Sequence, residues 1–188
     1  MNIVEWLSSL GWIEWTAFIT GVICVTLIVI EKDINWPIGV VNSILLIYCF
    51  WTQQLWATVG LQVFYTIGCL YGWYKWTRRD KVSGFKLVRI GNTPWKMTGW
   101  LTLIGSVAVA ALYPILVWLE DPYPFWDALV GVASLIAEYL LCLKMRQAWT
   151  VYFFCDFITM AVLYLLATNG PEEYRNIAWV TLAQYVVF

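Results

Sequence analysis

Polar side chains set inside long apolar runs are the residues of this sequence that could do chemistry. The candidates are Asn42, Ser43, Gln62, Ser134, Glu138 and Asp156. Such groups are costly inside a membrane, and they commonly line the path of a solute or an ion. The alternative is that they hydrogen-bond neighbouring helices to one another. We expect Gln62 and Asn42 to belong to a binding site, and we leave both roles open for the serines.

Aromatic residues accompany these polar groups. Tyr65 lies one helical turn beyond Gln62, and Tyr152 lies one turn beyond Trp149. Trp36 and Trp149 open two apolar segments at corresponding places. Rings that face one another could stack a flat heterocycle or gate its path. Most other tryptophans are expected in the interfacial belts of a membrane protein. These are Trp12, Trp15, Trp51, Trp56, Trp73, Trp76, Trp100 and Trp118.

Charge narrows the kind of solute that such a site could bind. No Lys or Arg falls in the core of an apolar segment, where only Glu138 and Asp156 are charged. A phosphate group needs cationic or clustered N–H partners, so we expect a phosphorylated solute to be rejected. Aromatic rings and an acid favour a neutral or cationic solute through cation–π attraction. The expected substrate-binding residues are Trp36, Asn42, Ser43, Gln62, Tyr65, Ser134, Trp149, Tyr152 and Asp156.

The composition places the whole chain in a lipid bilayer. Its 188 residues are 62% hydrophobic and 12% charged, whereas soluble domains have about 45–50% apolar and roughly 25% charged residues. A net charge of −1 without a basic arm argues against nucleic acid as a partner. Without histidine or a CxxC pair, neither a metal site nor a cofactor is expected. No nucleotide-hydrolysis motif is visible, so nothing favours an enzyme.

Seven segments are predicted to cross the membrane, because a spanning helix needs about 20 apolar residues. The segments cover about 12–30, 35–51, 55–76, 97–118, 128–143, 149–168 and 171–188. A basic connection, 77–96, precedes the fourth, and Thr93 followed by Pro94 is expected to cap its start. An acidic loop, 120–127, follows the fourth segment, and residues 1–10 could form a short interfacial helix.

Basic residues predict the orientation of these segments. Ten of the eleven Lys and Arg residues lie in alternate connections: Lys32, the stretch 75–96, and Lys144 with Arg146. Connections that face the cytoplasm are rich in Lys and Arg. The chain is therefore expected to cross the membrane several times with its N-terminus outside.

The same topology predicts an internal repeat. Segments one to three and segments five to seven both start outside, so they run in parallel. We therefore expect an all-α membrane protein that forms one transporter domain, 1–188, with repeats at 12–76 and 125–188 joined by a linker helix, 97–118. Parallel repeats of this kind occur in transporters of small solutes, with the site between the repeats.

Several blocks of the sequence resemble one family. They are Asn35–Gly39 (NWPIG), Leu61–Gln62, Tyr65 and Tyr71–Trp76 (YGWYKW) in the first half, and Asp127–Ala128, Ser134, Ala137, Lys144, Trp149, Asp156 and Tyr164 in the second. Together they resemble the PnuC-type nicotinamide riboside transporters. The resemblance implies facilitated diffusion of nicotinamide riboside across a bacterial inner membrane. It also implies a SWEET-like three-plus-one-plus-three fold and a homo-oligomer, a trimer.

One position departs from the pattern of that family, and other functions stay open. The family has a WxxW pair where this chain has Trp149 and Tyr152, so the role of Tyr152 is open. The same fold could carry another nucleoside, thiamine or a sugar, and a membrane carboxylate allows proton-coupled uptake. A membrane enzyme and a structural or signalling protein are the remaining alternatives.

Overall fold

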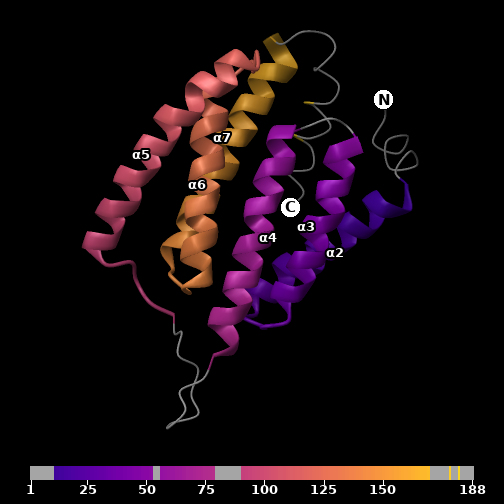
Figure 1. Cartoon of the computed structure of the whole chain (residues 1–188), viewed down its shortest axis with the longest axis vertical. Helices are drawn as coiled ribbons and strands as arrows, with labels where there is room; N and C mark the ends of the chain where they lie inside the picture. The colour runs from indigo at the N-terminus through magenta and orange to yellow at the C-terminus, as the bar shows by residue number, and fades with distance from the viewer. Residues whose placement is uncertain (1–10, 53–55, 79–89, 170–177, 179–181, 183–188) are drawn as a thin grey trace. The chain divides into compact units, whose positions relative to one another are not determined.

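The regular elements of the structure are helices. The computed structural model describes residues 11–52, 56–78 and 90–169, together with Ala178 and Leu182. The helices are α2 (Trp12–Val29), α3 (Asn35–Thr52), α4 (Trp56–Thr77), α5 (Trp95–Trp118), α6 (Pro124–Cys142) and α7 (Gln147–Asn169), drawn in Figure 1. Each coincides with an expected segment to within a few residues. The expected interfacial helix, 1–10, and nearly all of the seventh segment, 171–188, lie outside the described residues.

Three of these helices, α5, α6 and α7, are long and apolar enough to cross a membrane. The 24 residues of α5 span about 36 Å, against a hydrocarbon core of about 30 Å. Trp100, Ile104 and Val107 of α5 are all more than half exposed, as suits a helix that faces lipid on several sides. A shorter apolar stretch, Trp15–Val29, lies in α2. Helices α3 and α4 carry amides and aromatic residues among their apolar ones.

Two connections differ from the expectation. Pro94 and not Thr93 is the N-cap residue of α5, and no side chain caps the helix. The backbone nitrogen and hydroxyl of Thr93 instead donate to Oε1 of Gln147, at 2.9 and 3.0 Å. Helix α6 begins at Pro124, so the expected acidic loop 120–127 is wrong in its second half. Proline suits the first turn of a helix, where its missing N–H costs no hydrogen bond.

Three helices end in the same hydrogen-bonded turn. Glu31, Glu120 and Lys144 follow α2, α5 and α6 with left-handed φ angles of 55°, 57° and 56°. The backbone nitrogens of each residue and its successor donate to carbonyls three and five residues back, at 2.9–3.1 Å. This Schellman arrangement usually places glycine at the left-handed position. Here a charged residue occupies it each time.

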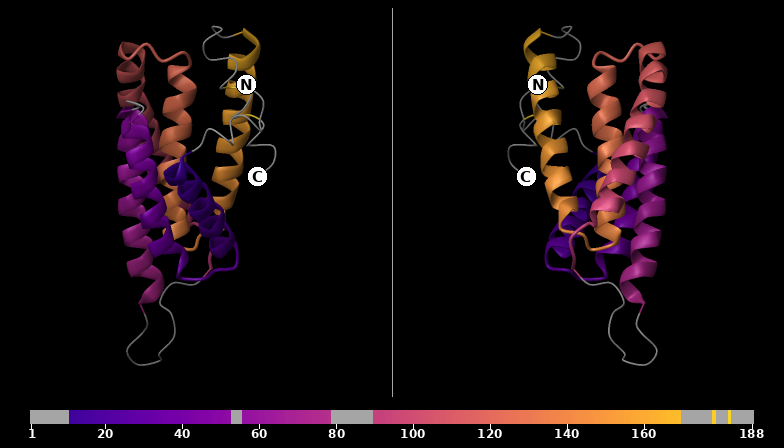
Figure 2. Two further views of the ribbon diagram at one scale, coloured as in Figure 1. Left: turned by 90° about the vertical axis from the view of Figure 1, so that its right-hand side faces the viewer. Right: turned by 90° about the vertical axis from the view of Figure 1, so that its left-hand side faces the viewer.

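The helices fall into two compact units. The α2–α4 unit holds α2, α3, α4 and the end of α6 with the turn after it, Glu138–Arg146. Within it, α3 packs against both α2 and α4 (Figure 1). The α5–α7 unit holds α5, the rest of α6 and α7. Within it, α5 and α6 run antiparallel and are joined by residues 119–123 (Figure 2).

Candidate functional site

Small residues bring α3 and α4 into close contact. A Cβ atom added to Gly39 of α3 would lie 2.8 Å from Sγ of Cys69 in α4. A Cβ atom added to Gly72 of α4 would overlap the indole ring of Trp36. Residues without bulk allow membrane helices to approach each other in this way. The contact therefore lets Trp36 lie directly against the backbone of α4.

Trp36 is the most enclosed of the expected site residues. Its side chain is 1% exposed, and its ring meets that of Trp76 nearly edge to face, with centroids 5.2 Å apart. The neighbouring Asn35 is 0% exposed. Nε1 of Trp36 and both amide atoms of Asn35 have no hydrogen-bond partner among the described residues. Each such buried polar group costs about 1–3 kcal/mol. These costs offset part of the stability that the close packing of Trp36 contributes.

The expectation that Trp76 belongs to an interfacial belt is wrong. Its side chain is 2% exposed, and its Nε1 donates to the carbonyl oxygen of Cys142 at 3.2 Å. The sequence carries a signal for this in Gly72, because residues four apart share a helix face. The other belt tryptophans whose side chains the structure describes are exposed: Trp12, Trp15, Trp51, Trp73, Trp100 and Trp118.

Asn42 and Ser43 take part in the packing of α3. Nδ2 of Asn42 donates to the carbonyl oxygen of Ala17 at 2.6 Å and to Oγ1 of Thr20 at 3.0 Å, which joins α3 to α2. Ser43 is 5% exposed and interacts with the thiol of Cys69 in α4. Asn42 and Ser43 therefore both connect α3 to a neighbouring helix, which is the alternative role that the sequence left open for Ser43. Because Nδ2 of Asn42 is used in these bonds, its Oδ1 is the atom of this amide that could accept a hydrogen bond from a ligand.

Gln62 and Tyr65 lie on the face of α4 that also carries Cys69, Gly72 and Trp76, at spacings of three and four residues. Both side chains are half-buried. The hydroxyl of Thr66 donates to the backbone carbonyl of Gln62 at 2.9 Å. No described residue hydrogen-bonds the side-chain amide of Gln62. That amide is thus the polar group of this face with capacity for a ligand.

The other expected site residues belong to the α5–α7 unit. Trp149, Tyr152 and Asp156 follow one another on α7 at the same spacing of three and four residues. Trp149 is 46% exposed, Tyr152 is half-buried and Asp156 is exposed. Ser134 of α6 is 8% exposed, and its hydroxyl donates to the carbonyl oxygen of Val130 at 2.7 Å. The expected site is therefore divided between two units, each with an aromatic and polar stripe.

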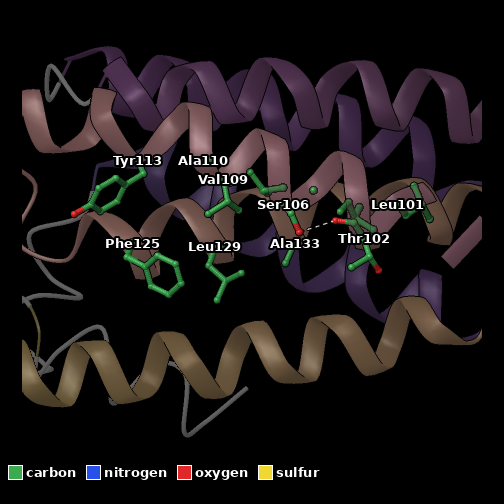
Figure 3. A pocket seen from close by; sticks show the side chains of 12 residues that line it. Leu101, Thr102, Ser106, Val109, Ala110, Tyr113, Phe125, Leu129 and Ala133 are labelled. Carbon is green, nitrogen blue, oxygen red and sulfur yellow. Dashed lines mark hydrogen bonds between the residues drawn. The ribbon is translucent and has the colours of Figure 1, made fainter. Parts of the chain in front are cut away.

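A cavity of about 640 Å³ between α5 and α6 contains none of the expected site residues. Figure 3 shows its lining, which is mostly apolar, with side chains such as Leu101, Val109 and Leu129. The hydroxyl of Ser106 donates to the carbonyl oxygen of Thr102 at 2.9 Å, so it is used within α5. Sites for polar solutes need several convergent polar groups. This cavity lacks them, and it is not the candidate solute site.

Comparison with known proteins identifies relatives over nearly the whole chain. The nicotinamide riboside transporter PnuC of Escherichia coli (strain K12) is 28% identical over 200 residues, covering 93% of this chain and 83% of that protein. The protein of the same name from Neisseria mucosa is 21% identical over 158 residues, covering 81% of this chain and 59% of that protein.

A solved structure has the same fold. The structure described as "Crystal structure of the Vitamin B3 transporter PnuC" aligns with a TM-score of 0.65 at 19% identity, covering 93% of this chain and 77% of that one. Residues 11–188 match the family described as "Nicotinamide mononucleotide transporter". The resemblance drawn from the sequence blocks is thereby confirmed. The chain belongs to the nicotinamide mononucleotide transporter family and is a membrane transporter, not an enzyme.

Proposed function

We propose that this chain carries nicotinamide riboside across the bacterial inner membrane by facilitated diffusion. The observation that carries the proposal is the family match over residues 11–188. The relatives from Escherichia coli and Neisseria mucosa, both named nicotinamide riboside transporters, support the choice of solute. Nicotinamide riboside is a cationic aromatic ring that bears a ribose, so it suits aromatic and amide groups.

The distribution of charge supports the riboside over the mononucleotide for which the family is named. Within the described helices, the Lys and Arg residues are Lys75 in the last turn of α4 and Lys96 at the start of α5. Lys144, which follows α6, has a side chain that is 8% exposed and is already paired with Glu31. A phosphate group needs cationic partners. We therefore expect the riboside to bind and the mononucleotide to be rejected.

The proposed contacts divide between stacking and hydrogen bonding. Aromatic rings stack or gate the nicotinamide ring, and polar groups hold its amide and the ribose hydroxyls. Gln62 leads the second group because no described residue uses its side-chain amide. The proposed stacking residues are Trp36, Tyr65, Trp149 and Tyr152, and the proposed polar residues are Asn42, Ser43, Gln62, Ser134 and Asp156.

The proposed architecture is seven spans in a SWEET-like three-plus-one-plus-three order, with the N-terminus outside. Helices α2–α4 form the first repeat, α5 is the linker, and α6 and α7 begin the second. The matching ends of α2 and α6 support this assignment, because each is followed at the same distance by a tryptophan, Trp36 or Trp149. Rocking of the two repeats gives alternating access to the site. We propose that the protein assembles as a homotrimer.

Calorimetric titration of the purified chain with each solute tests the function. We expect saturable binding of nicotinamide riboside and none of nicotinamide mononucleotide. Equal binding of both would defeat the charge argument but keep the transporter in its family. Binding of neither by folded protein would defeat the proposed substrate, and titration with thiamine and other nucleosides would follow.

Two variants in the same titration test the site. Gln62→Ala should weaken riboside binding roughly three- to tenfold, as expected for the loss of one or two neutral hydrogen bonds. Thr66→Val is the matched control, because among the described residues the Thr66 hydroxyl donates to the backbone carbonyl of Gln62 one turn away and to no other group. It should bind the riboside like the parent protein. Unchanged affinity in folded Gln62→Ala would remove Gln62 from the site.

A further inference from the structure

Charged and aromatic contacts tie the end of α6 to the helices of the α2–α4 unit. Nζ of Lys144 lies 2.9 Å from Oε2 of Glu31 and 3.9 Å from the centre of the Trp76 ring. Nε1 of Trp76 donates to the carbonyl oxygen of Cys142, at the last residue of α6. The side chain of Lys144 is only 8% exposed although it is charged. Its ammonium group therefore lies between the Glu31 carboxylate and the face of the Trp76 ring, in a contact that is open to solvent on the Glu31 side.

Glu31 and Lys144 occupy corresponding positions of the two proposed repeats. Each is the left-handed residue after its helix, α2 or α6, and the same two backbone hydrogen bonds hold it. The residues four positions further on, Asn35 and Ala148, are both 0% exposed. Helix α5 ends with the same turn at Glu120, but there the residue four positions on is not fully buried. The ion pair thus joins equivalent turns.

Backbone contacts fix the same turn to the connection that precedes α5. The nitrogen of Gly91 donates to the carbonyl oxygen of Lys144 at 3.1 Å, and the nitrogen of Arg146 donates to that of Gly91 at 3.0 Å. Glu31, Gly91 and Lys144 all belong to connections that carry most of the Lys and Arg residues. In the proposed topology these connections face the cytoplasm. The contacts therefore lie at the inner end of the transporter.

We propose that Glu31, Lys144 and Trp76 form the inner gate of the transport pathway. This inference rests on the proposed function. When the gate is closed, Lys144 bridges Glu31 and the Trp76 ring, and Trp76 in turn backs the indole of Trp36. When it opens, the end of α6 parts from α2 and α4, and the charge of Lys144 passes into water, which the half-exposed Glu31 already contacts. Glu31 and Lys144 act as positioning residues, because they reach the proposed stacking ring of Trp36 through Trp76.

Buried polar atoms near the gate favour its opening. Nδ2 and Oδ1 of Asn35 and Nε1 of Trp36 are enclosed without a hydrogen-bond partner among the described residues. Opening the gate lets water or the solute reach them. Closure therefore gains an ion pair and a cation–π contact but leaves these polar atoms unpaired. Such opposing contributions keep two conformations close in free energy, as alternating access requires.

The rate at which a maleimide labels Cys142 measures the opening. Cys142 is 1% exposed, and its Sγ lies 3.4 Å from the carbonyl oxygen of Gly68 in α4, so parting α6 from α4 uncovers it. The purified chain keeps Cys142 as its only cysteine, with alanine at the others: Cys24, Cys49, Cys69 and Cys155. Lys144→Met should speed labelling about tenfold, since it removes an ion pair and a cation–π contact.

Three further variants make the test specific. Lys75→Met removes a neighbouring cation that lies 5.4 Å from the ring of Tyr71, and it should label at the parent rate. Lys144→Arg keeps a cation that can pair and stack, so it should restore slow labelling. Glu31→Gln breaks the ion pair at a residue that is 46% exposed. It should also speed labelling, and it serves where Lys144→Met does not fold.

The outcomes separate the gate from the transport function. Parent-rate labelling in folded Lys144→Met and Glu31→Gln overturns the gate, as does equal acceleration in Lys75→Met. Neither result changes the titration with nicotinamide riboside. Failure of riboside binding with fast labelling of Lys144→Met would defeat the substrate and leave the gate.

Discussion

At the scale of single residues, Gly72 decides where Trp36 lies. A side chain at position 72 would occupy the space of the indole ring, so only glycine allows that ring to lie on α4. The ring also contacts Trp76, and both tryptophan side chains are buried. The position of a proposed stacking residue thus depends on the absence of a Cβ atom on another helix.

Gly72→Ala is therefore expected to destabilise the protein by about 1–3 kcal/mol, the usual cost of overpacking a close contact. Gly60→Ala is the matched control on the same helix, because a Cβ atom there meets nothing within 4 Å. It should stabilise α4 by about 0.5–1 kcal/mol, since alanine favours a helix over glycine. Thermal unfolding in detergent measures both. Equal melting temperatures for the two variants would contradict the contact between Trp36 and Gly72.

The residue scale also shows what one sequence can tell about the site. The hydrogen bonds of the Asn42 amide and of the Trp76 indole could not be predicted from the residue types, because each is made with a partner distant in sequence. Asn42 bonds Ala17 and Thr20 of α2, and Trp76 bonds Cys142 after 66 residues. Neither pairing leaves a local pattern. The apolar surroundings of these residues could be predicted from the sequence, but their hydrogen-bond partners could not.

At the scale of elements, the ends of three helices share one geometry but differ in what their left-handed residue does. Glu31 and Lys144 pair with each other, whereas Glu120 after α5 is exposed and has no ion pair among the described residues. A left-handed conformation costs an L-residue roughly 1–2 kcal/mol. At Glu120 no ion pair with a described residue offsets that cost.

Glu120→Gly should consequently stabilise the chain. Relief of the left-handed strain, less the entropy that glycine adds to the unfolded state, leaves a gain of about 0.5–1 kcal/mol. Glu31→Gly relieves the same strain but loses the ion pair to Lys144, so its melting temperature should rise less or fall. Thermal unfolding of both variants provides the comparison. A larger rise for Glu31→Gly would show that the ion pair contributes nothing to stability.

Helix position was predictable at this scale because it follows from apolar length, whereas helix ends were not. The six described helices match expected segments, which were located by the roughly 20 apolar residues that a spanning helix needs. The start of α6 was missed because Pro124 lies in a loop-like acidic sequence yet suits a first helical turn. The cap of α5 was missed because Gln147, far along the chain, takes the hydrogen bonds of Thr93.

At the scale of the whole molecule, the proposed site residues are divided between the two units. Each unit carries its own stripe, with Gln62 and Tyr65 on α4 and Trp149 and Tyr152 on α7. The repeat predicted from the basic connections gives a reason for two similar stripes. In the proposed topology the direction in which α5 crosses the membrane decides whether the two repeats run in parallel.

Single cysteines on either side of α5 test this topology in a background with alanine at the natural cysteines. Thr77→Cys marks the exposed end of α4, and Glu120→Cys marks the exposed residue that follows α5. Because ten of eleven basic residues lie in alternate connections, Thr77→Cys should react with an impermeant maleimide only in inside-out vesicles. Glu120→Cys should react only in intact cells. Reaction of both from one side would mean that α5 does not cross, and the two repeats could not then be parallel.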